Sequence, residues 1–303
     1  RMFLPFGYNI FVAFWACHYA AEKLGCEVVP GGVLDTEARI MKMQELKCTA
    51  FGATPTYVLG MADTARKIGI DPRSIGIQRI TCAGEPGASI PTTKQRIEEA
   101  WGAKVYDHIG ATEIGAWSYM CTAQKGLHIN EAFFLVEIED TETGEIIEEP
   151  MKNGKMIITA FDRQAKPCIR FDSKDVIRWA DYECECGRTF RIIDGGVVGR
   201  ADDITKVKGV LLAPTAIEEV VRSFNELSDE YEVIVTKKGD IDDIMLKIEI
   251  KPGFEKQEAD ILNRLKDQLR VKTNLGYKIE IHPYESLPRY ALKAKRFKDL
   301  RPH

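Results

Sequence analysis

The alternation of helical and strand-like segments over the first 120 residues limits the possible folds more than any other feature. Apolar residues recur at helical spacing in successive stretches, and a short apolar run follows each of them. Strands that alternate with helices of this length predict βαβ units and a mostly parallel sheet. The predicted helices are Ile10–Leu24, Thr36–Leu46, Tyr57–Ile68 and Ile90–Trp101, and the predicted strands are Cys26–Pro30, Cys48–Ala53, Ile77–Ala83 and Lys104–Ile109.

The pattern becomes β-rich from Phe133 and changes again after Gly199. The sequence therefore predicts an α/β protein with a core domain at residues 1–199 and a small α+β C-terminal domain at residues 200–303. The core divides into an α/β part, residues 1–120, and a β-rich part, residues 121–199. The β-rich strands are Phe134–Glu139, Met156–Phe161 and Ile169–Trp179, and the C-terminal elements are helices Pro214–Phe224 and Glu255–Leu269 with strands Glu230–Lys237, Ile244–Ile250 and Lys278–His282.

Charge and composition exclude several classes of protein. The formal net charge is −4, and no basic stripe with interleaved aromatic residues is present, so nucleic acid is not an expected partner. The longest apolar run, Ile10–Cys17, is far shorter than the roughly 20 residues that a membrane-spanning helix needs. No signal segment is visible, and we expect a cytoplasmic protein, without a membrane partner, whose cysteines are reduced.

Two pairs of metal-binding residue types occur around the β-rich part. Cys184 and Cys186 form a knuckle, and Cys121 and His128 are the other closely spaced pair. Structural zinc takes four ligands, and thiolates with imidazole are a favoured mixture. We therefore expect these four side chains to bind one structural Zn²⁺. The alternative is a set of unrelated thiols and a surface histidine.

Polar turns at the ends of the predicted parallel strands suggest a nucleotide site, because ligands of such sheets gather at the carboxyl ends of the strands. Thr112 and Glu113 offer a hydroxyl and a carboxylate that suit phosphate oxygens and Mg²⁺. The glycine beside Glu85 allows a planar ligand to approach the backbone closely, although Gly-Glu-Pro is also a common turn. Asp175 follows an apolar strand, where its carboxylate suits ribose hydroxyls. A tight polar turn and a solvated aspartate are the alternatives.

Two basic blocks near the C-terminus suggest a lid that closes over the nucleotide site. In GRADD, Arg200 offers a planar fork for phosphate or ribose oxygens, and the predicted hinge lies near Asp202 or Asp203. In SLPRYALKAKR, Lys293 and Lys295 occupy a stretch predicted to be exposed and irregular. A lysine delivered by lid closure would neutralise charge that develops on a phosphorylated carboxylate. A solvated basic terminus is the alternative.

Together these segments resemble a phenylacetate–CoA ligase-type member of the adenylate-forming superfamily, whose wider relatives are acyl-CoA synthetases and peptide-synthetase adenylation domains. The resemblance runs from about Phe6 to Arg301. It rests on motifs that occur in family order: PFGYNIF with AEKLGCEVVPGG, ATPTYVLGMADTARKIGID, AGEP, HIGATE, GLHINEAFFLVEIED, CECGRT, GRADD and SLPRYALKAKR.

The resemblance implies binding roles for individual residues. Cys121, His128, Cys184 and Cys186 match zinc-ligating positions of this branch. The residues that would line the adenine, ribose, acyl and pantetheine sites are Gly84, Glu85, Pro86, Tyr106, Asp107, His108, Gly110, Asp175, Arg200 and Gly209.

The same resemblance implies the catalytic groups. Thr112 and Glu113 would serve the phosphates and Mg²⁺, Lys293 would promote adenylation, and Asp202 would be the pivot of the lid. Leu292 stands where the family has a glycine before its lysine, which leaves Lys295 as the alternative to Lys293.

The implied function is that of an ATP-dependent carboxylic acid–CoA ligase for an aryl or arylacetic acid. Such an enzyme uses ATP, Mg²⁺ and coenzyme A, forms an acyl-adenylate and releases AMP as the thioester forms. The alternatives are a different acceptor, as in the related coenzyme F390 synthetases or in carrier-protein loading, and a non-catalytic nucleotide- or acyl-binding module.

One family feature is not found in the sequence. The family's upstream Ser/Thr/Gly-rich phosphate loop has no counterpart, and the chain starts at Arg1. We therefore expect the chain alone to bind AMP-like ligands poorly and not to adenylate. The apolar core domain also leaves a homodimer open.

Overall fold

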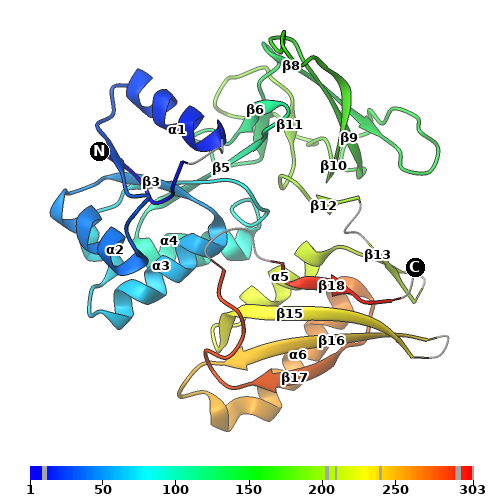
Figure 1. Ribbon diagram of the computed structural model, residues 1–303. Coiled ribbons are helices and arrows are strands. Elements are labelled where there is room, and N and C mark those ends of the chain that lie inside the picture. Colours follow the sequence, from blue (N-terminus) through cyan, green and yellow to red (C-terminus); the bar gives the residue numbers. More distant parts are fainter. Residues whose placement is uncertain (9–11, 202–204, 209, 239–240, 291–294, 302–303) are drawn as a thin grey trace. The chain divides into compact units, whose positions relative to one another are not determined.

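The computed structural model describes residues 1–8, 12–201, 205–208, 210–238, 241–290 and 295–301 (Figure 1). The chain divides into two compact units, Arg1–Ala201 and Asp202–His303. This division lies two residues beyond the boundary that the sequence suggested. Asp202, Gly209 and Lys293, to which the resemblance gives roles, lie outside the described residues.

A sheet of eight strands forms the centre of the first unit, in the order β11-β7-β6-β5-β4-β3-β1-β2. The pairs from β5 to β2 are all parallel, which confirms the prediction from the alternating pattern. The last three strands, β6, β7 and β11, extend the sheet with antiparallel pairing. The strands are β1 (Met2–Leu4), β2 (Val28–Pro30), β3 (Ala50–Ala53), β4 (Arg79–Cys82), β5 (Lys104–Ala111), β6 (Gly115–Tyr119), β7 (Leu127–Ile129) and β11 (Ile192–Ile193).

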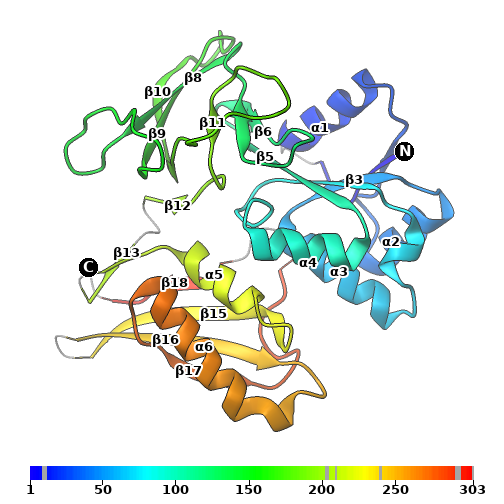
Figure 2. The same ribbon diagram turned by 180° about the vertical axis from the view of Figure 1, so that it is seen from behind.

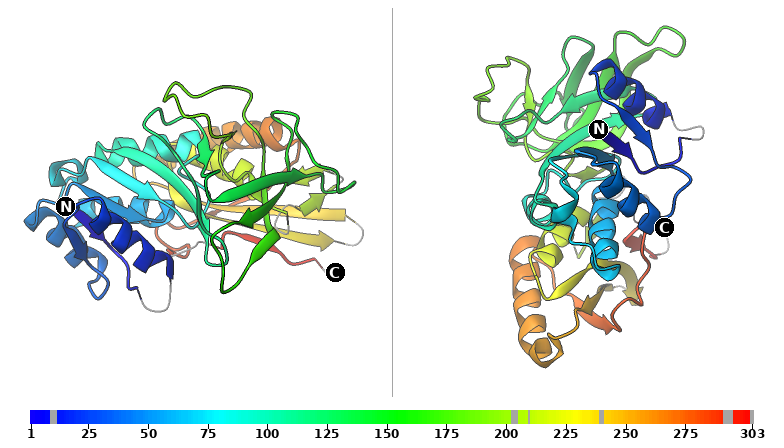
Figure 3. Two further views of the ribbon diagram at one scale, coloured as in Figure 1. Left: turned by 90° about the horizontal axis from the view of Figure 1, so that it is seen from above. Right: turned by 90° about the vertical axis from the view of Figure 1, so that its left-hand side faces the viewer.

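Three helices cover one face of the parallel strands, and their apolar sides share one core with them. α1 lies on the opposite face beside β2 (Figures 1 and 3). The helix starts follow local chemistry, since Asp35 caps α2 by accepting from the Ala38 N–H at 2.8 Å and Thr54 caps α3. The helices are α1 (Val12–Lys23), α2 (Thr36–Glu45), α3 (Pro55–Lys67) and α4 (Pro91–Trp101), with a short 3₁₀ helix η1 (Pro72–Ile75).

A second, antiparallel sheet completes the first unit, in the order β12-β10-β9-β8. Its strands are β8 (Phe134–Glu139), β9 (Gly154–Ala160), β10 (Cys168–Ile177) and β12 (Gly199–Arg200). Its buried side chains share a core with β6 and β7 of the first sheet, so that Trp117 and Leu127 pack in one cluster with Val136 and Ile158. The β-rich part therefore begins inside the first sheet, and residue 120 is not a structural boundary.

The second unit is a four-stranded sheet in the order β17-β16-β15-β18, with α5 and α6 packed on one face (Figure 2). A separate hairpin, β13 with β14, precedes α5. The elements are β13 (Thr205–Val207), β14 (Val210–Leu212), α5 (Pro214–Arg222), β15 (Leu227–Lys238), β16 (Ile241–Ile250), η2 (Glu255–Gln257), α6 (Glu258–Thr273), β17 (Lys278–His282) and β18 (Phe297–Asp299).

The C-terminal segment contains a strand that the sequence analysis did not predict. Phe297–Asp299, just after the SLPRYALKAKR block, forms β18 and pairs in parallel with β15. These three residues show no clear alternation of apolar and polar side chains, so their sequence does not predict a strand. The strand forms because β15 offers an edge with which to pair. Among the described residues, no helix is long and apolar enough to cross a membrane.

Trp101 should dominate the stability of the first unit. Its side chain is fully buried, and the indole N–H donates to the carbonyl oxygen of Val58 on α3 at 3.1 Å. We predict that Trp101→Ala lowers the free energy of unfolding by about 3–5 kcal/mol because it leaves a large cavity. Urea denaturation followed by the fluorescence of the remaining tryptophans measures this, and Tyr19→Ala on exposed α1 is the control. Equal losses in both variants would contradict the prediction.

Candidate functional site

The turn that follows β4 is fixed against the start of α3. Gly84 and Gly87 have φ angles of +94° and +149°, a region that favours glycine. The Glu85 carboxylate accepts a hydrogen bond from the backbone N–H of Thr56 at 2.8 Å. A Cβ on Gly87 would lie 2.8 Å from Pro55. The sequence predicted a role for Glu85 at the adenine wall. The structure shows a further, structural role, because this hydrogen bond connects the turn to the start of α3.

Asp107 of β5 holds the other end of the same turn. Its side chain is buried, the Ser89 hydroxyl donates a hydrogen bond to its carboxylate, and the backbone N–H of His108 donates a second at 2.9 Å. Burial raises the pKa of Asp107 to about 6, although the hydrogen bonds from Ser89 and His108 act in the opposite direction. Asp107 was predicted to bind the nucleotide, and its contacts favour positioning the turn.

The neighbouring residues of β5 are placed by β6. The imidazole of His108 pairs its Nδ1 with the Ser118 carbonyl oxygen at 2.9 Å, and burial lowers its pKa. Tyr106 is half-buried against the core of the β-rich part. At Gly110 the two strands approach so closely that a Cβ would lie 2.9 Å from the Gly115 carbonyl oxygen. Glycine is therefore required at that position.

A second segment reaches the same turn from far along the chain. Gly196, between β11 and β12, has a φ of +72° and lies so near Ser89 that a Cβ on it would be 2.9 Å from the Ser89 side chain. The turn after β4, strand β5 and the Gly195–Gly196 segment therefore meet at Ser89. Neither Ser89 nor Gly196 was predicted from the sequence, and the adjacent glycines at 195 and 196 are the signal that could have indicated a close approach.

A cavity of about 490 Å³ lies at the carboxyl end of β5. Thr112 and Glu113, both exposed, line one side of it. The turn Asp162–Lys166 between β9 and β10 lines the other side. The carboxylate and hydroxyl predicted for phosphates and Mg²⁺ thus open onto a space rather than pack into the protein.

Two contacts hold that turn beside the strand. Arg163 Nε donates to the carbonyl oxygen of Ile114 at 2.8 Å, and the Cys168 thiol donates to the carbonyl oxygen of Glu113 at 3.1 Å. Arg163 and Lys166 bring positive charge to a cavity where Glu113 brings negative charge. Such a mixture suits an anion together with a divalent cation. The sequence analysis missed both cations, which lie in an irregular turn without a motif.

Asp175 and Arg200 stand opposite each other on adjacent antiparallel strands, β10 and β12. The guanidinium Nη1 lies 3.7 Å from a carboxylate oxygen of Asp175 and donates to the Ser173 carbonyl oxygen at 3.3 Å. The two residues predicted to serve the ribose are therefore neighbours. Their proximity comes from strand pairing across 25 residues of sequence.

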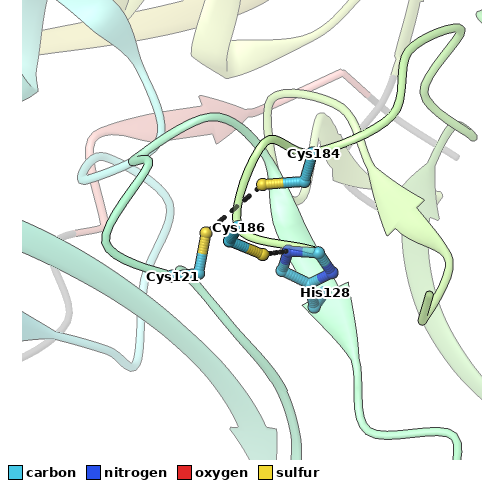
Figure 4. A group of neighbouring side chains, drawn as sticks. All are labelled: Cys121, His128, Cys184 and Cys186. Atoms are coloured by element: carbon cyan, nitrogen blue, oxygen red, sulfur yellow. Dashed lines mark hydrogen bonds between the residues drawn. The ribbon is translucent and has the colours of Figure 1, made fainter. Parts of the chain in front are cut away.

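Four side chains from three segments converge in the β-rich part (Figure 4). Cys121 follows β6, His128 lies on β7, and Cys184 and Cys186 lie in the loop between β10 and β11. Their donor atoms all lie within 4.8 Å of one another. Pairing of Ile192 on β11 with His128 on β7 brings the loop to the other two residues.

The donor geometry fits a tetrahedral metal site. Sγ of Cys121 lies 3.5 Å from Sγ of Cys184, and Sγ of Cys186 lies 3.3 Å from Nε2 of His128. A zinc ion with Zn–S bonds of about 2.3 Å sets ligand atoms roughly 3.5–3.8 Å apart, whereas a disulfide requires about 2.05 Å. The set of three thiols and one imidazole therefore fits zinc better than a disulfide.

The surroundings prepare His128 and Cys186 as ligands. His128 is fully buried, and its Nδ1 lies 3.2 Å from the Phe190 carbonyl oxygen, so a proton on Nδ1 leaves Nε2 free to bind metal. The backbone N–H of Arg188 lowers the pKa of the Cys186 thiol to about 6, which favours thiolate. The contact with Phe190 depends on tertiary pairing, whereas the contact between Arg188 and Cys186 is local to one loop.

Several known proteins are similar to this chain in sequence. Residues 209–301 match the family described as the AMP-binding enzyme C-terminal domain. A phenylacetate–coenzyme A ligase of Thermus thermophilus is 30% identical over 318 residues, covering 98% of this chain and 70% of that protein. The chain belongs to the phenylacetate–coenzyme A ligase family. A ligase of the same name from Aromatoleum evansii is 30% identical over 309 residues, covering 99% of this chain and 68% of that protein.

Solved structures confirm the predicted α/β fold of the adenylate-forming superfamily. A 2-hydroxyisobutyryl-CoA ligase superposes with a TM-score of 0.92 at 24% identity, and the match covers 98% of this chain and 65% of that chain. A benzoate–CoA ligase from Burkholderia xenovorans gives a TM-score of 0.70 at 18% identity, covering 97% and 60%. The chain thus spans less than two thirds of the length of these solved relatives.

Asp107 predicts a pH dependence of stability. Because its pKa is raised in the folded protein, the folded state keeps a proton at pH values where the unfolded chain has lost it. Stability therefore falls as the pH rises from about 4 to about 6, and Asp107→Asn has no proton to lose. A shift of about two pKa units predicts that the variant gains on the order of 3 kcal/mol over the parent in this window.

Urea denaturation at pH 4, 5, 6 and 7 measures the difference between Asp107→Asn and the parent. Tryptophan fluorescence is the suitable signal because all four tryptophans lie in the first unit. Glu142→Gln, in an exposed loop, is the control and should follow the parent at every pH. Parallel pH profiles for Asp107→Asn and the parent would contradict the assigned pKa.

Proposed function

We propose that this protein is an ATP-dependent carboxylic acid–CoA ligase of the AMP-forming type, acting on an aryl or arylacetic acid. The membership of the chain in its family supports the reaction class. The relatives named above are phenylacetate–coenzyme A ligases, which supports an arylacetic acid as the substrate.

The observation that carries the proposal is the cavity at the carboxyl end of β5. It joins Thr112 and Glu113 with the cations Arg163 and Lys166 around about 490 Å³ of space. This position is where ligands of parallel sheets bind. We assign the phosphates of ATP to this cavity, with Thr112 and Glu113 as the oxygen donors that would hold Mg²⁺.

In the first half-reaction, the substrate carboxylate attacks the α-phosphorus of ATP. A P–O bond forms to the acid, and the bond to the leaving pyrophosphate breaks. Arg163 and Lys166 would neutralise the charge on the pyrophosphate, and bound Mg²⁺ would add to that neutralisation. The product is an acyl-adenylate, a mixed anhydride that is a far better electrophile than the carboxylate.

The remaining predicted residues would bind the adenosine part of ATP. Asp175 would accept hydrogen bonds from the ribose hydroxyls, with Arg200 beside it. The turn from Gly84 to Pro86 would form the adenine wall. Asp107 would act through Ser89 by holding that turn in place.

In the second half-reaction, the CoA thiol attacks the carbonyl carbon of the adenylate, and AMP leaves. We assign Lys293 to the first step, Asp202 to the hinge that separates the steps, and Gly209 to the pantetheine passage. These assignments follow from family position alone.

The test uses the full-length protein with ATP, CoA and phenylacetate. We expect release of AMP and formation of phenylacetyl-CoA, measured by chromatography. Glu113→Gln should slow pyrophosphate release by about 10²–10³-fold, because it removes a carboxylate that would hold the Mg²⁺ that neutralises the departing pyrophosphate. Glu142→Gln is the matched control and should match the parent.

Other outcomes of this test would support one of the alternative functions. AMP release without dependence on CoA would favour a different acceptor. Nucleotide binding without turnover of any aryl acid would favour a non-catalytic module. Full activity of Glu113→Gln would overturn the assignment of the cavity.

For the metal centre, we propose one structural Zn²⁺ held by Cys121, His128, Cys184 and Cys186. Four protein ligands would leave no open position, so the ion would join the β10–β11 loop to β6 and β7 rather than take part in the chemistry. Support comes from the donor distances and the orientation of His128.

The zinc proposal predicts about one zinc per purified chain. Cys186→Ser should lower the zinc content to well under half and lower the melting temperature by several degrees, because a ligand and its share of folding free energy are lost. Cys26→Ser, a single cysteine outside the cluster, is the control. Metal analysis and thermal denaturation with and without chelator measure both effects. Well under one zinc in the parent protein would sink the proposal.

A further inference from the structure

One segment of chain joins the proposed metal centre to the turn that follows β4. This segment, residues 178–196, carries Cys184 and Cys186, and we call it the knuckle segment. At its end, a Cβ on Gly196 would lie 2.9 Å from the side chain of Ser89 in that turn. Ser89 in turn donates a hydrogen bond to the buried carboxylate of Asp107. The knuckle segment and the turn are therefore in direct contact.

Asp194 fixes the knuckle segment at its base. One oxygen of its carboxylate accepts from Arg178 Nε at 2.9 Å and Nη2 at 2.6 Å, and the other accepts from the Tyr182 hydroxyl at 3.2 Å. The backbone N–H of Asp194 donates to the Arg178 carbonyl oxygen at 3.1 Å. Both partners lie near the start of the segment, so Asp194 closes it into a loop just before Gly196.

Tyr182 connects this base to the other half of the metal centre. Its hydroxyl lies so near Gly126 that a Cβ on that glycine would be 2.6 Å away. The Lys125 ammonium lies 4.0 Å from the centroid of the Tyr182 ring. Lys125 and Gly126 immediately precede β7, which carries His128. Tyr182 therefore links the knuckle segment to the chain that supplies another ligand.

The metal centre also reaches Asp107 by a second route. The backbone N–H of Met120 donates to the Asp107 carbonyl oxygen at 2.9 Å, and Cys121 is the next residue. The two routes, through Gly196 and through Met120, thus end at the same hydrogen-bonded pair, which is Ser89 with Asp107.

A closed metal site restricts the segments that supply its ligands. Segments that are free without the ion must adopt one arrangement when it binds, and this ordering has a free-energy cost. A ligand that binds at the turn needs its neighbouring segments in one arrangement, and it bears less of this cost once the metal has ordered them. Linkage makes the effect mutual, because each ligand must strengthen the binding of the other by the same factor.

We propose that Asp194 is a positioning residue through which the metal centre sets the turn after β4, so that zinc and nucleotide bind cooperatively. The inference rests on the proposed function, which gives this turn to adenine, and on the proposed metal centre. Asp194 itself is neither a zinc ligand nor a nucleotide contact. It holds Gly196 against Ser89, so its replacement should uncouple two sites that each remain intact.

Titration calorimetry of the full-length protein with AMP measures the effect on the nucleotide. We expect the Kd for AMP to be about 5–50-fold higher in Asp194→Asn than in the parent, although the variant should keep about one zinc per chain. With phenylacetate as the acid, KM for ATP should rise by a similar factor while kcat stays within about threefold, because the variant loses binding and not chemistry. Asp181→Asn, which changes an exposed residue of the same segment, is the matched control and should match the parent.

Mutual coupling distinguishes positioning from a general loss of structure. In the parent, saturating AMP should raise the affinity for zinc by about 5–50-fold, measured by competition with a chromophoric chelator. In Asp194→Asn, AMP should change the zinc affinity by less than about twofold. A variant that is only destabilised would bind zinc less tightly with and without AMP. Tyr182→Phe removes one hydrogen bond to Asp194 and guards against a folding defect, because it should show a smaller loss of the same coupling.

Hydrogen exchange reports on the turn without nucleotide. The Ile90 amide donates to the Gly87 carbonyl oxygen at 2.9 Å within the turn that contains Ser89. Its exchange should quicken at least about fivefold in Asp194→Asn, whereas peptides from α2 should be unchanged. Exchange at Ile90 equal to that of the parent would contradict the proposed contact through Gly196.

The possible failures can be told apart. If the parent binds zinc but no AMP, the proposed nucleotide site fails and the inference fails with it. If the purified parent holds no zinc, the metal centre and the inference fail together. If the parent binds both but neither changes the affinity for the other, the inference alone fails. Loss of zinc from Asp194→Asn would also overturn it, because Asp194 would then support the metal centre itself.

Discussion

The parallel pairing of β1 to β5 is the constraint on which the first unit depends. Because these strands run in one direction, their carboxyl ends share an edge, and the turns that follow β3, β4 and β5 must meet there. The hydrogen bond from the Thr56 N–H to Glu85 joins the first two of these turns. The third turn, which follows β5, contains Thr112 and Glu113 and lines the cavity. The place of the proposed nucleotide site at this edge thus follows from strand direction.

Buried carboxylates fix the positions of chain segments that strand direction alone does not determine. Asp107 holds the turn after β4 through its hydrogen bond with Ser89. Burial disfavours the charged carboxylate and raises its pKa to about 6. Glu249 does the same for the Leu287–Arg289 segment, where arginine keeps it ionised. In both cases, a polar group in a poor environment is useful because few arrangements satisfy it. Each unit therefore uses a buried carboxylate to fix a neighbouring segment of chain.

The sequence was sufficient to predict site residues whose chemical type marks them, such as thiols and imidazole. It did not predict residues that matter only through their tertiary contacts. Cys121 and His128 could be matched with the Cys184–Cys186 knuckle because thiols and imidazole favour zinc, and the four donors do converge. Ser89 and Arg163 carry no such chemical mark. Ser89 matters because Gly196 and Asp107 both reach it, and Arg163 because its turn folds back on Ile114. Those contacts depend on chain that is distant in sequence.

By itself, the sequence determined the alternating elements, the parallel sheet and the family, because periodicity and motifs are local properties of the chain. Only the tertiary structure decided that β7 and β11 extend the first sheet and that β18 forms within a basic tail, since a short strand exists only through its partner. It also decided that Glu249 meets Arg289 across 40 residues. Burial selects such pairs, and burial is a property of the whole fold.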